Sequence, residues 1–134
     1  MLRSFVWPDQ LDRFAALDAA LALASSVPVE IDRADAAEWV VEHLGQAVDG
    51  VATVLFQSIV WQYLPPATSE AVRATVKAAG ARATAQAPVA WLRMEPGNNP
   101  EKGAEVRLRQ WPGEERLVAI TGYHGRPVRL YDGD

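Results

Sequence analysis

Apolar side chains recur at steps of three and four residues in two stretches of the chain, residues 8–24 and 36–44. This is the spacing of helices that bury one face. In the first stretch the apolar stripe comprises Leu11, Phe14, Leu17, Leu21 and Ala24. In the second stretch the expected inner face comprises Ala37, Val40, Val41 and Leu44. The pattern therefore predicts two amphipathic helices in the first third of the chain.

The residues at the ends of these stretches favour helix caps. Pro8 suits the first turn of the first helix, and Asp32 or Asp35 can cap the second. A third helix is predicted over residues 68–79, with Gly80 in the place of a left-handed C-terminal cap.

Residues 51–56 form an unbroken apolar run and give the clearest strand prediction. A strand that is apolar on both faces belongs in the middle of a sheet that is covered on both sides. Residues 88–94 predict a further strand, and Val27–Ile31 is a short, weaker candidate. The run at 51–56 is therefore expected to be the central strand of a parallel sheet.

After residue 103 the pattern changes to alternation. Residues 104–111, 117–120 and 128–131 are strand-like and are separated by turns, which predicts an antiparallel meander. Strands that alternate with helices imply a parallel sheet. The predicted fold is α/β: a partial doubly wound (Rossmann-like), mostly parallel sheet that ends in antiparallel strands, as a single domain over residues 1–134.

The composition narrows the classes of function. The net charge is −4, from 13 basic and 17 acidic residues without a basic stripe, which disfavours nucleic acid as a partner. There is no cysteine, and His43 and His124 lie far apart in sequence, so no metal site is expected. No apolar run approaches the roughly 20 residues of a membrane span. We expect a cytoplasmic protein with no membrane partner.

Candidate binding residues follow the run at 51–56. Gln57 and Ser58 come directly after it, and ligands of open α/β sheets bind at the carboxyl ends of strands. The alternative is a turn whose side chains satisfy local backbone groups. In the following stretch we expect Trp61 to pack inward and Tyr63 to face the cleft. Glu95 lies at the carboxyl end of the next strand. We expect it to be a solvated loop carboxylate, and the alternative is that it forms a polar wall of the cleft.

Four segments carry a family resemblance: FVWPDQ, SIVWQYLP, APVAWLRMEP and YHGRPV. Together they resemble an uncharacterised bacterial family, the domain of unknown function 2332. From Val29 onward the order of elements also resembles the later part of class I S-adenosylmethionine-dependent methyltransferases. That resemblance implies S-adenosylmethionine as a possible cofactor, with Asp35 matching the acidic residue near the adenine amine. The residue pattern itself favours a helix N-cap for Asp35, and the two roles can coexist.

One feature departs from the methyltransferase pattern. The first glycine is Gly45, so no glycine-rich turn follows an early strand. We therefore expect an incomplete methyltransferase-like domain, the C-terminal portion of a longer architecture. It would bind a nucleotide-type small molecule through Asp35, Gln57, Ser58 and Tyr63, and no residue is assigned a catalytic role. The alternative is a non-catalytic interaction module, which pairs with a second copy or with a missing N-terminal portion.

Overall fold

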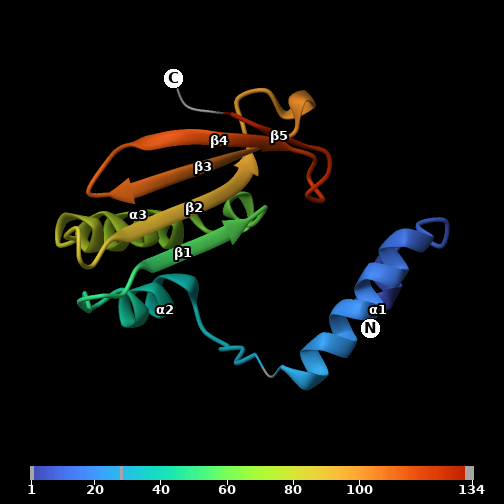
Figure 1. Ribbon diagram of the computed structural model, residues 1–134, viewed down its shortest axis with the longest axis horizontal. Helices are drawn as coiled ribbons and strands as arrows, with labels where there is room; N and C mark the ends of the chain where they lie inside the picture. The colour runs from blue at the N-terminus through green and yellow to red at the C-terminus, as the bar shows by residue number, and fades with distance from the viewer. Residues whose placement is uncertain (1, 28, 132–134) are drawn as a thin grey trace. The chain divides into compact units, whose positions relative to one another are not determined.

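The computed structural model describes residues 2–27 and 29–131 of the chain. It divides into two compact units, residues 1–33 and 34–134 (Figure 1). The assignment of the whole chain to one domain stays a prediction.

The first unit contains a short 3₁₀ helix, Leu2–Phe5 (η1), and the helix α1, Leu11–Ser26. The predicted helix exists, although it begins three residues after Pro8, with Gln10 at the N-cap position. No residue of η1 or α1 is buried. The weaker strand predicted at Val27–Ile31 is wrong for the described residues, since 29–31 pair with no strand, and Pro28 lies outside those residues.

The second unit begins with α2, Ala36–His43. Asp35 is its N-cap, because the Asp35 carboxylate accepts a hydrogen bond from the backbone N–H of Ala37 at 2.8 Å. Val40 and Leu44 are buried as predicted. Val41 is instead exposed, and Trp39 packs against the core.

The second unit is built on one five-stranded sheet whose order follows the chain, β1-β2-β3-β4-β5. The strands are β1 Thr53–Ser58, β2 Val89–Pro96, β3 Ala104–Trp111, β4 Glu115–Thr121 and β5 Val128–Leu130. Only β1 and β2 pair in parallel, and the other three pairs are antiparallel.

The α/β prediction is confirmed, and the prediction of a mostly parallel sheet is wrong. Parallel neighbours need a long crossover, and the chain supplies one, the helix α3, Pro66–Ala81, between β1 and β2. Because β1 is the first strand in the sheet order, the run at 51–56 lies at an edge of the sheet and not at its centre.

Helices α2 and α3 build the core on one face of this sheet, which we call the covered face (Figure 1). Its buried centre comprises Val40, Leu44, Val72, Val76, Ala79, Val89 and Trp91. Gly80 belongs to this packing: α3 continues past it, and a Cβ there would collide with the ring of Trp111. The prediction of a left-handed cap at Gly80 is therefore wrong.

The opposite side, which we call the open face, carries no helix of the second unit. Alternation along paired strands assigns it these apolar residues: Val54, Phe56, Ala90, Leu92, Met94, Ala104, Val106, Leu108, Ala119, Val128 and Leu130. Of these, Ala104 and Ala119 are buried. Phe56 is 60% exposed and Leu130 is 74% exposed. An apolar run on both faces of β1 thus did not mean that both faces are covered.

Candidate functional site

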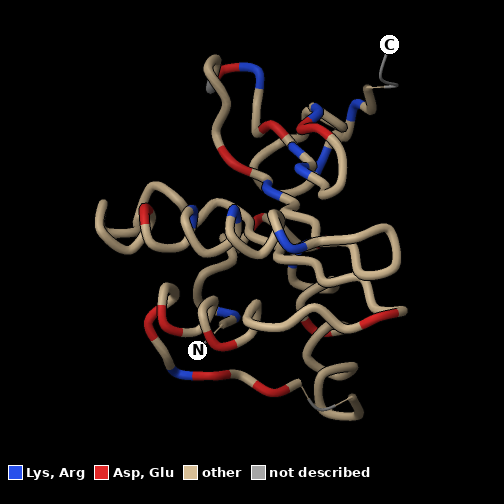
Figure 2. Tube along the Cα trace, turned by 90° about the vertical axis from the view of Figure 1, so that its left-hand side faces the viewer, with Lys and Arg blue, Asp and Glu red and all other residues tan. Residues whose placement is uncertain are grey.

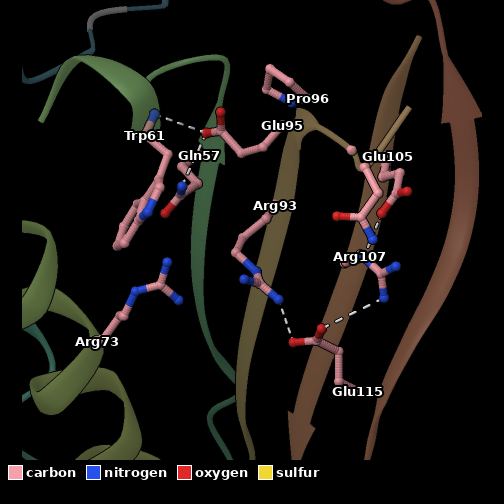
Figure 3. A pocket seen from close by; sticks show the side chains of 11 residues that line it. Gln57, Trp61, Arg73, Arg93, Glu95, Pro96, Glu105, Arg107 and Glu115 are labelled. Carbon is pink, nitrogen blue, oxygen red and sulfur yellow. Dashed lines mark hydrogen bonds and ion pairs between the residues drawn. The ribbon is translucent and has the colours of Figure 1, made fainter. Parts of the chain in front are cut away.

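A pocket of about 320 Å³ opens on the covered face, beside the carboxyl ends of the parallel strands β1 and β2 (Figure 3). It is lined by Gln57, Trp61, Arg73, Arg93, Glu95, Pro96, Gly97, Asn98, Glu105, Arg107 and Glu115. Gln57 is the last residue but one of β1. It lies on this face because it pairs with Arg93, which shares its face of β2 with the buried Trp91. Helix α3 contributes Arg73, and β3 contributes Glu105 and Arg107.

Glu95 organises the turn that forms one wall. Its Oε1 accepts hydrogen bonds from the Gln57 side-chain amide at 3.0 Å and from the backbone N–H groups of Val60 and Trp61, both at 3.2 Å. The turn also holds Ile59 at a φ of 49°, which is unusual for a β-branched residue. Glu95 is therefore a polar wall of the pocket and not a solvated loop carboxylate.

Gln57 is committed to the same network. Its Oε1 accepts from the indole N–H of Trp91 at 3.0 Å, while its amide nitrogen donates to Glu95. Both ends of the side chain are thus held by protein groups, which fixes its orientation in the wall.

The aromatic stretch after β1 divides between the core and the surface, with Trp61 packed inward as predicted. Trp61, in the 3₁₀ helix Trp61–Tyr63 (η2), packs against the core and meets Trp91 edge-on, with ring centroids 5.6 Å apart. Its other side faces Arg73, whose guanidinium carbon lies 4.5 Å from the ring centroid. Tyr63 is 74% exposed and does not line the 320 Å³ pocket.

The far side of the pocket is a cluster of ion pairs. The Glu115 carboxylate pairs with Arg93 through one oxygen and lies 3.7 Å from Arg107 Nη1 through the other. Arg107 also donates to Glu105 at 2.7 Å. Among the described residues, Arg73 has no carboxylate partner, and Figure 3 shows its side chain extending into the same space.

Two buried polar atoms in these walls have no hydrogen-bond partner among the described residues: Arg93 Nε and Glu95 Oε2. They belong to neighbouring same-face positions of β2. Unsatisfied buried polar atoms are costly and few in folded proteins. Their occurrence together in one pocket wall sets this region apart from the rest of the core.

A second, more open pocket of about 590 Å³ lies nearby and is lined by Ser58, Ile59, Gln62, Pro96, Tyr123 and His124. Ser58 and Gln57 are adjacent in a strand, so their side chains point to opposite faces and line different pockets. Asp35 and Tyr63 line neither of these two. The structure thus separates the four predicted residues, whose binding roles stay predictions.

Sequence reasoning missed Arg73, Arg93 and Arg107 as a group. The available signal was the pairing of two alternating stretches, residues 89–96 and 104–111, which sets Arg93 opposite Arg107. The charged positions are otherwise interleaved along the trace, as Figure 2 shows, and form no continuous basic stretch.

The fold and pocket define a mixed α/β protein with a charged pocket beside one parallel strand pair. The chain belongs to a family described as uncharacterized proteins conserved in bacteria (DUF2332), whose pattern matches residues 1–129. No curated protein and no solved structure matches the chain.

Among the described residues, no group of three or more His, Cys, Asp or Glu side chains is placed to hold a metal ion. None of the helices in the described part of the chain has the length and apolar character needed to cross a membrane.

Proposed function

We propose that the second unit is a small-molecule-binding domain, with its ligand in the pocket at the carboxyl ends of β1 and β2. The observation that carries the proposal is the convergence of a tryptophan and three arginines from η2, α3, β2 and β3 on one pocket. Its volume of about 320 Å³ falls within the roughly 300–1,000 Å³ of ligand sites.

The finer form of this proposal names a nucleotide-type ligand, with S-adenosylmethionine as the candidate that the family resemblance implies. Asp35, Gln57, Ser58 and Tyr63 are its predicted binding residues. Its support is the parallel β1–α3–β2 unit, because ligands of such units bind beyond the strand carboxyl ends. Trp61 offers an aromatic wall for a planar ring.

Calorimetric titration tests the proposal, with S-adenosylmethionine, its demethylated product, adenosine and adenosine 5′-monophosphate as ligands. We expect a dissociation constant in the range of about 1–100 μM for at least one of them. Arg73→Gln should weaken that binding. Lys77→Gln, on the same helix and exposed outside the pocket, is the matched control and should not. Millimolar or absent binding of all four ligands would contradict the proposal.

The open face supports a second candidate function, a module that pairs with a second copy of itself. Contiguous exposed apolar surface of this kind marks protein interfaces. Arg116 is the only charged residue in register with this face among the described strands. Two copies could meet face to face, as two-fold dimers do, through apolar contacts across most of the face, with one arginine, Arg116, contributed by each copy.

Light scattering at tens of micromolar protein tests this candidate. We expect a dimer for the parent chain and a monomer for Phe56→Lys, which places a charge on the open face. Val41→Lys, at an exposed position of α2 away from that face, is the control and should remain dimeric. A parent chain that stays monomeric would remove this candidate.

A further inference from the structure

Two of the three arginines of the pocket lie beside one carboxylate, that of Glu115. It pairs with Arg93 from β2 and faces Arg107 from β3 at 3.7 Å. Arg73 from α3 lies across the pocket, as Figure 3 shows. Glu115 is the first residue of β4, directly after the β3–β4 turn, and its side chain is 37% exposed. The negative charge beside Arg93 and Arg107 thus comes from a partly exposed side chain at the start of a strand.

The ionic pairing at this end of the pocket is uneven. Arg107 has Glu105 as a further partner at 2.7 Å. Glu95 takes its hydrogen bonds from Gln57 and the backbone of the turn, at the opposite end of the pocket. If Glu115 swung out to solvent, three guanidinium groups would line the pocket with two remaining carboxylates, those of Glu95 and Glu105. One positive charge would then be unbalanced, and Arg73 and Arg93 would both lack a carboxylate partner among the described residues.

We infer that the pocket binds the phosphomonoester group of its ligand between Arg73, Arg93 and Arg107, and that the Glu115 carboxylate occupies this anion position when no ligand is bound. The inference rests on the proposed ligand site and names the group that it recognises. A phosphomonoester carries a charge of about −1.5 to −2 at pH 7, so it attracts the two guanidinium groups that would lack a carboxylate partner, Arg73 and Arg93, more strongly than a carboxylate does. Its three oxygens can also accept from guanidinium groups on three different elements.

The same arrangement makes Glu115 a competitor of the ligand. Each anion that enters must displace a carboxylate that already pairs with Arg93. The apparent affinity is therefore the intrinsic affinity multiplied by the fraction of protein in which Glu115 has left the site. Glu114 provides a matched comparison. It lies one residue earlier, pairs with Arg109 at 3.0 Å, is 93% exposed and does not line the pocket.

The test compares adenosine 5′-monophosphate with adenosine by calorimetry, and adds inorganic phosphate to separate the anion from the nucleoside. We expect the monophosphate to bind at least about tenfold more tightly than adenosine, since charge-assisted hydrogen bonds are the strong ones. Glu115→Gln should tighten monophosphate binding by about tenfold and leave adenosine unchanged. Glu114→Gln should change neither. Inorganic phosphate should compete with the monophosphate.

The outcomes separate this inference from the proposed function. If the monophosphate and adenosine bind equally in both the parent and Glu115→Gln, or if S-adenosylmethionine alone binds, the phosphate inference is overturned and the ligand site stands. If none of the probes binds either protein, both are overturned. Arg73→Gln is the second variant, independent of Glu115. It should abolish the preference for the monophosphate, and a preference that survives it, beside an unchanged Lys77→Gln control, also overturns the inference.

Discussion

The covered and open faces of the sheet take alternate residues of the same strands. On β2, Val89 and Trp91 point to the covered face and are buried, while Ala90 and Leu92 point to the open face and are only partly so. The covered face meets two helices and then, past the end of the core, becomes a charged pocket. The open face is apolar over most of its width, with Arg116 as its one charged residue among the described strands, and it meets no helix of its unit. The two faces are both rich in apolar residues, but only the covered face contributes its full apolar area to the stability of the fold, because stability comes from the area that is buried.

The largest expected effect is on the covered face. Trp91 is 6% exposed, packs against Trp61, and donates its indole N–H to Gln57. Trp91→Ala should lower the free energy of unfolding by about 3–5 kcal/mol, because it leaves a large cavity and an unpaired amide oxygen. Urea unfolding followed by circular dichroism measures it. A loss below about 1 kcal/mol would show that the covered face is not the core.

Gly80→Ala should have the next largest effect. A methyl group there collides with the ring of Trp111, so the ring or α3 must shift. Overpacking of this kind costs about 1–3 kcal/mol. Gly45→Ala is the control, since its added Cβ would lie 3.4 Å from the nearest backbone oxygen, a contact that a small adjustment relieves. Equal melting temperatures for the two variants would argue against the close contact between α3 and β3.

Phe56→Ala should have a smaller effect in the isolated chain. The residue is already 60% exposed on the open face, so truncation removes only part of a burial term and should cost under about 1 kcal/mol. If the open face pairs with a second copy, the loss should grow with protein concentration, because dimerisation then contributes to stability. Thermal melts at two concentrations distinguish the two cases.

Tyr63→Phe should have the smallest effect. The tyrosine is 74% exposed, so loss of its hydroxyl should change the free energy of unfolding by no more than about 0.5 kcal/mol. If the hydroxyl contacts a ligand, as the binding prediction for Tyr63 holds, the variant should weaken ligand affinity while its melting temperature stays that of the parent. A large loss of stability would instead show a buried structural role.

The helices were predictable from sequence because periodicity and caps are local signals. Asp35 shows this directly, since the cap depends only on the next two residues. The strand pairing was not local. An apolar run such as 51–56 fits both a central strand and an edge strand with one bare face, and only the pairing partners distinguish them.

The pocket could not be predicted for the same reason, because strand pairing brings its residues together. Arg93 and Arg107 come together through the register of β2 and β3, and Glu115 joins them through the β3–β4 turn. Sequence reasoning did place Gln57 at a strand's carboxyl end. The alternation of strand residues could also have separated Gln57 from Ser58, which the single-site prediction overlooked.

The most direct test of this account is to map where a ligand binds. A titration with adenosine 5′-monophosphate, followed by ¹H–¹⁵N nuclear magnetic resonance, reports on the Trp61 indole, the Gln57 amide and the backbone of each face. We predict saturable shifts at Trp61, Gln57 and Arg73, with Val54, Phe56 and Leu130 on the open face unchanged. Shifts confined to the open face, or none at the pocket at millimolar ligand, would contradict it.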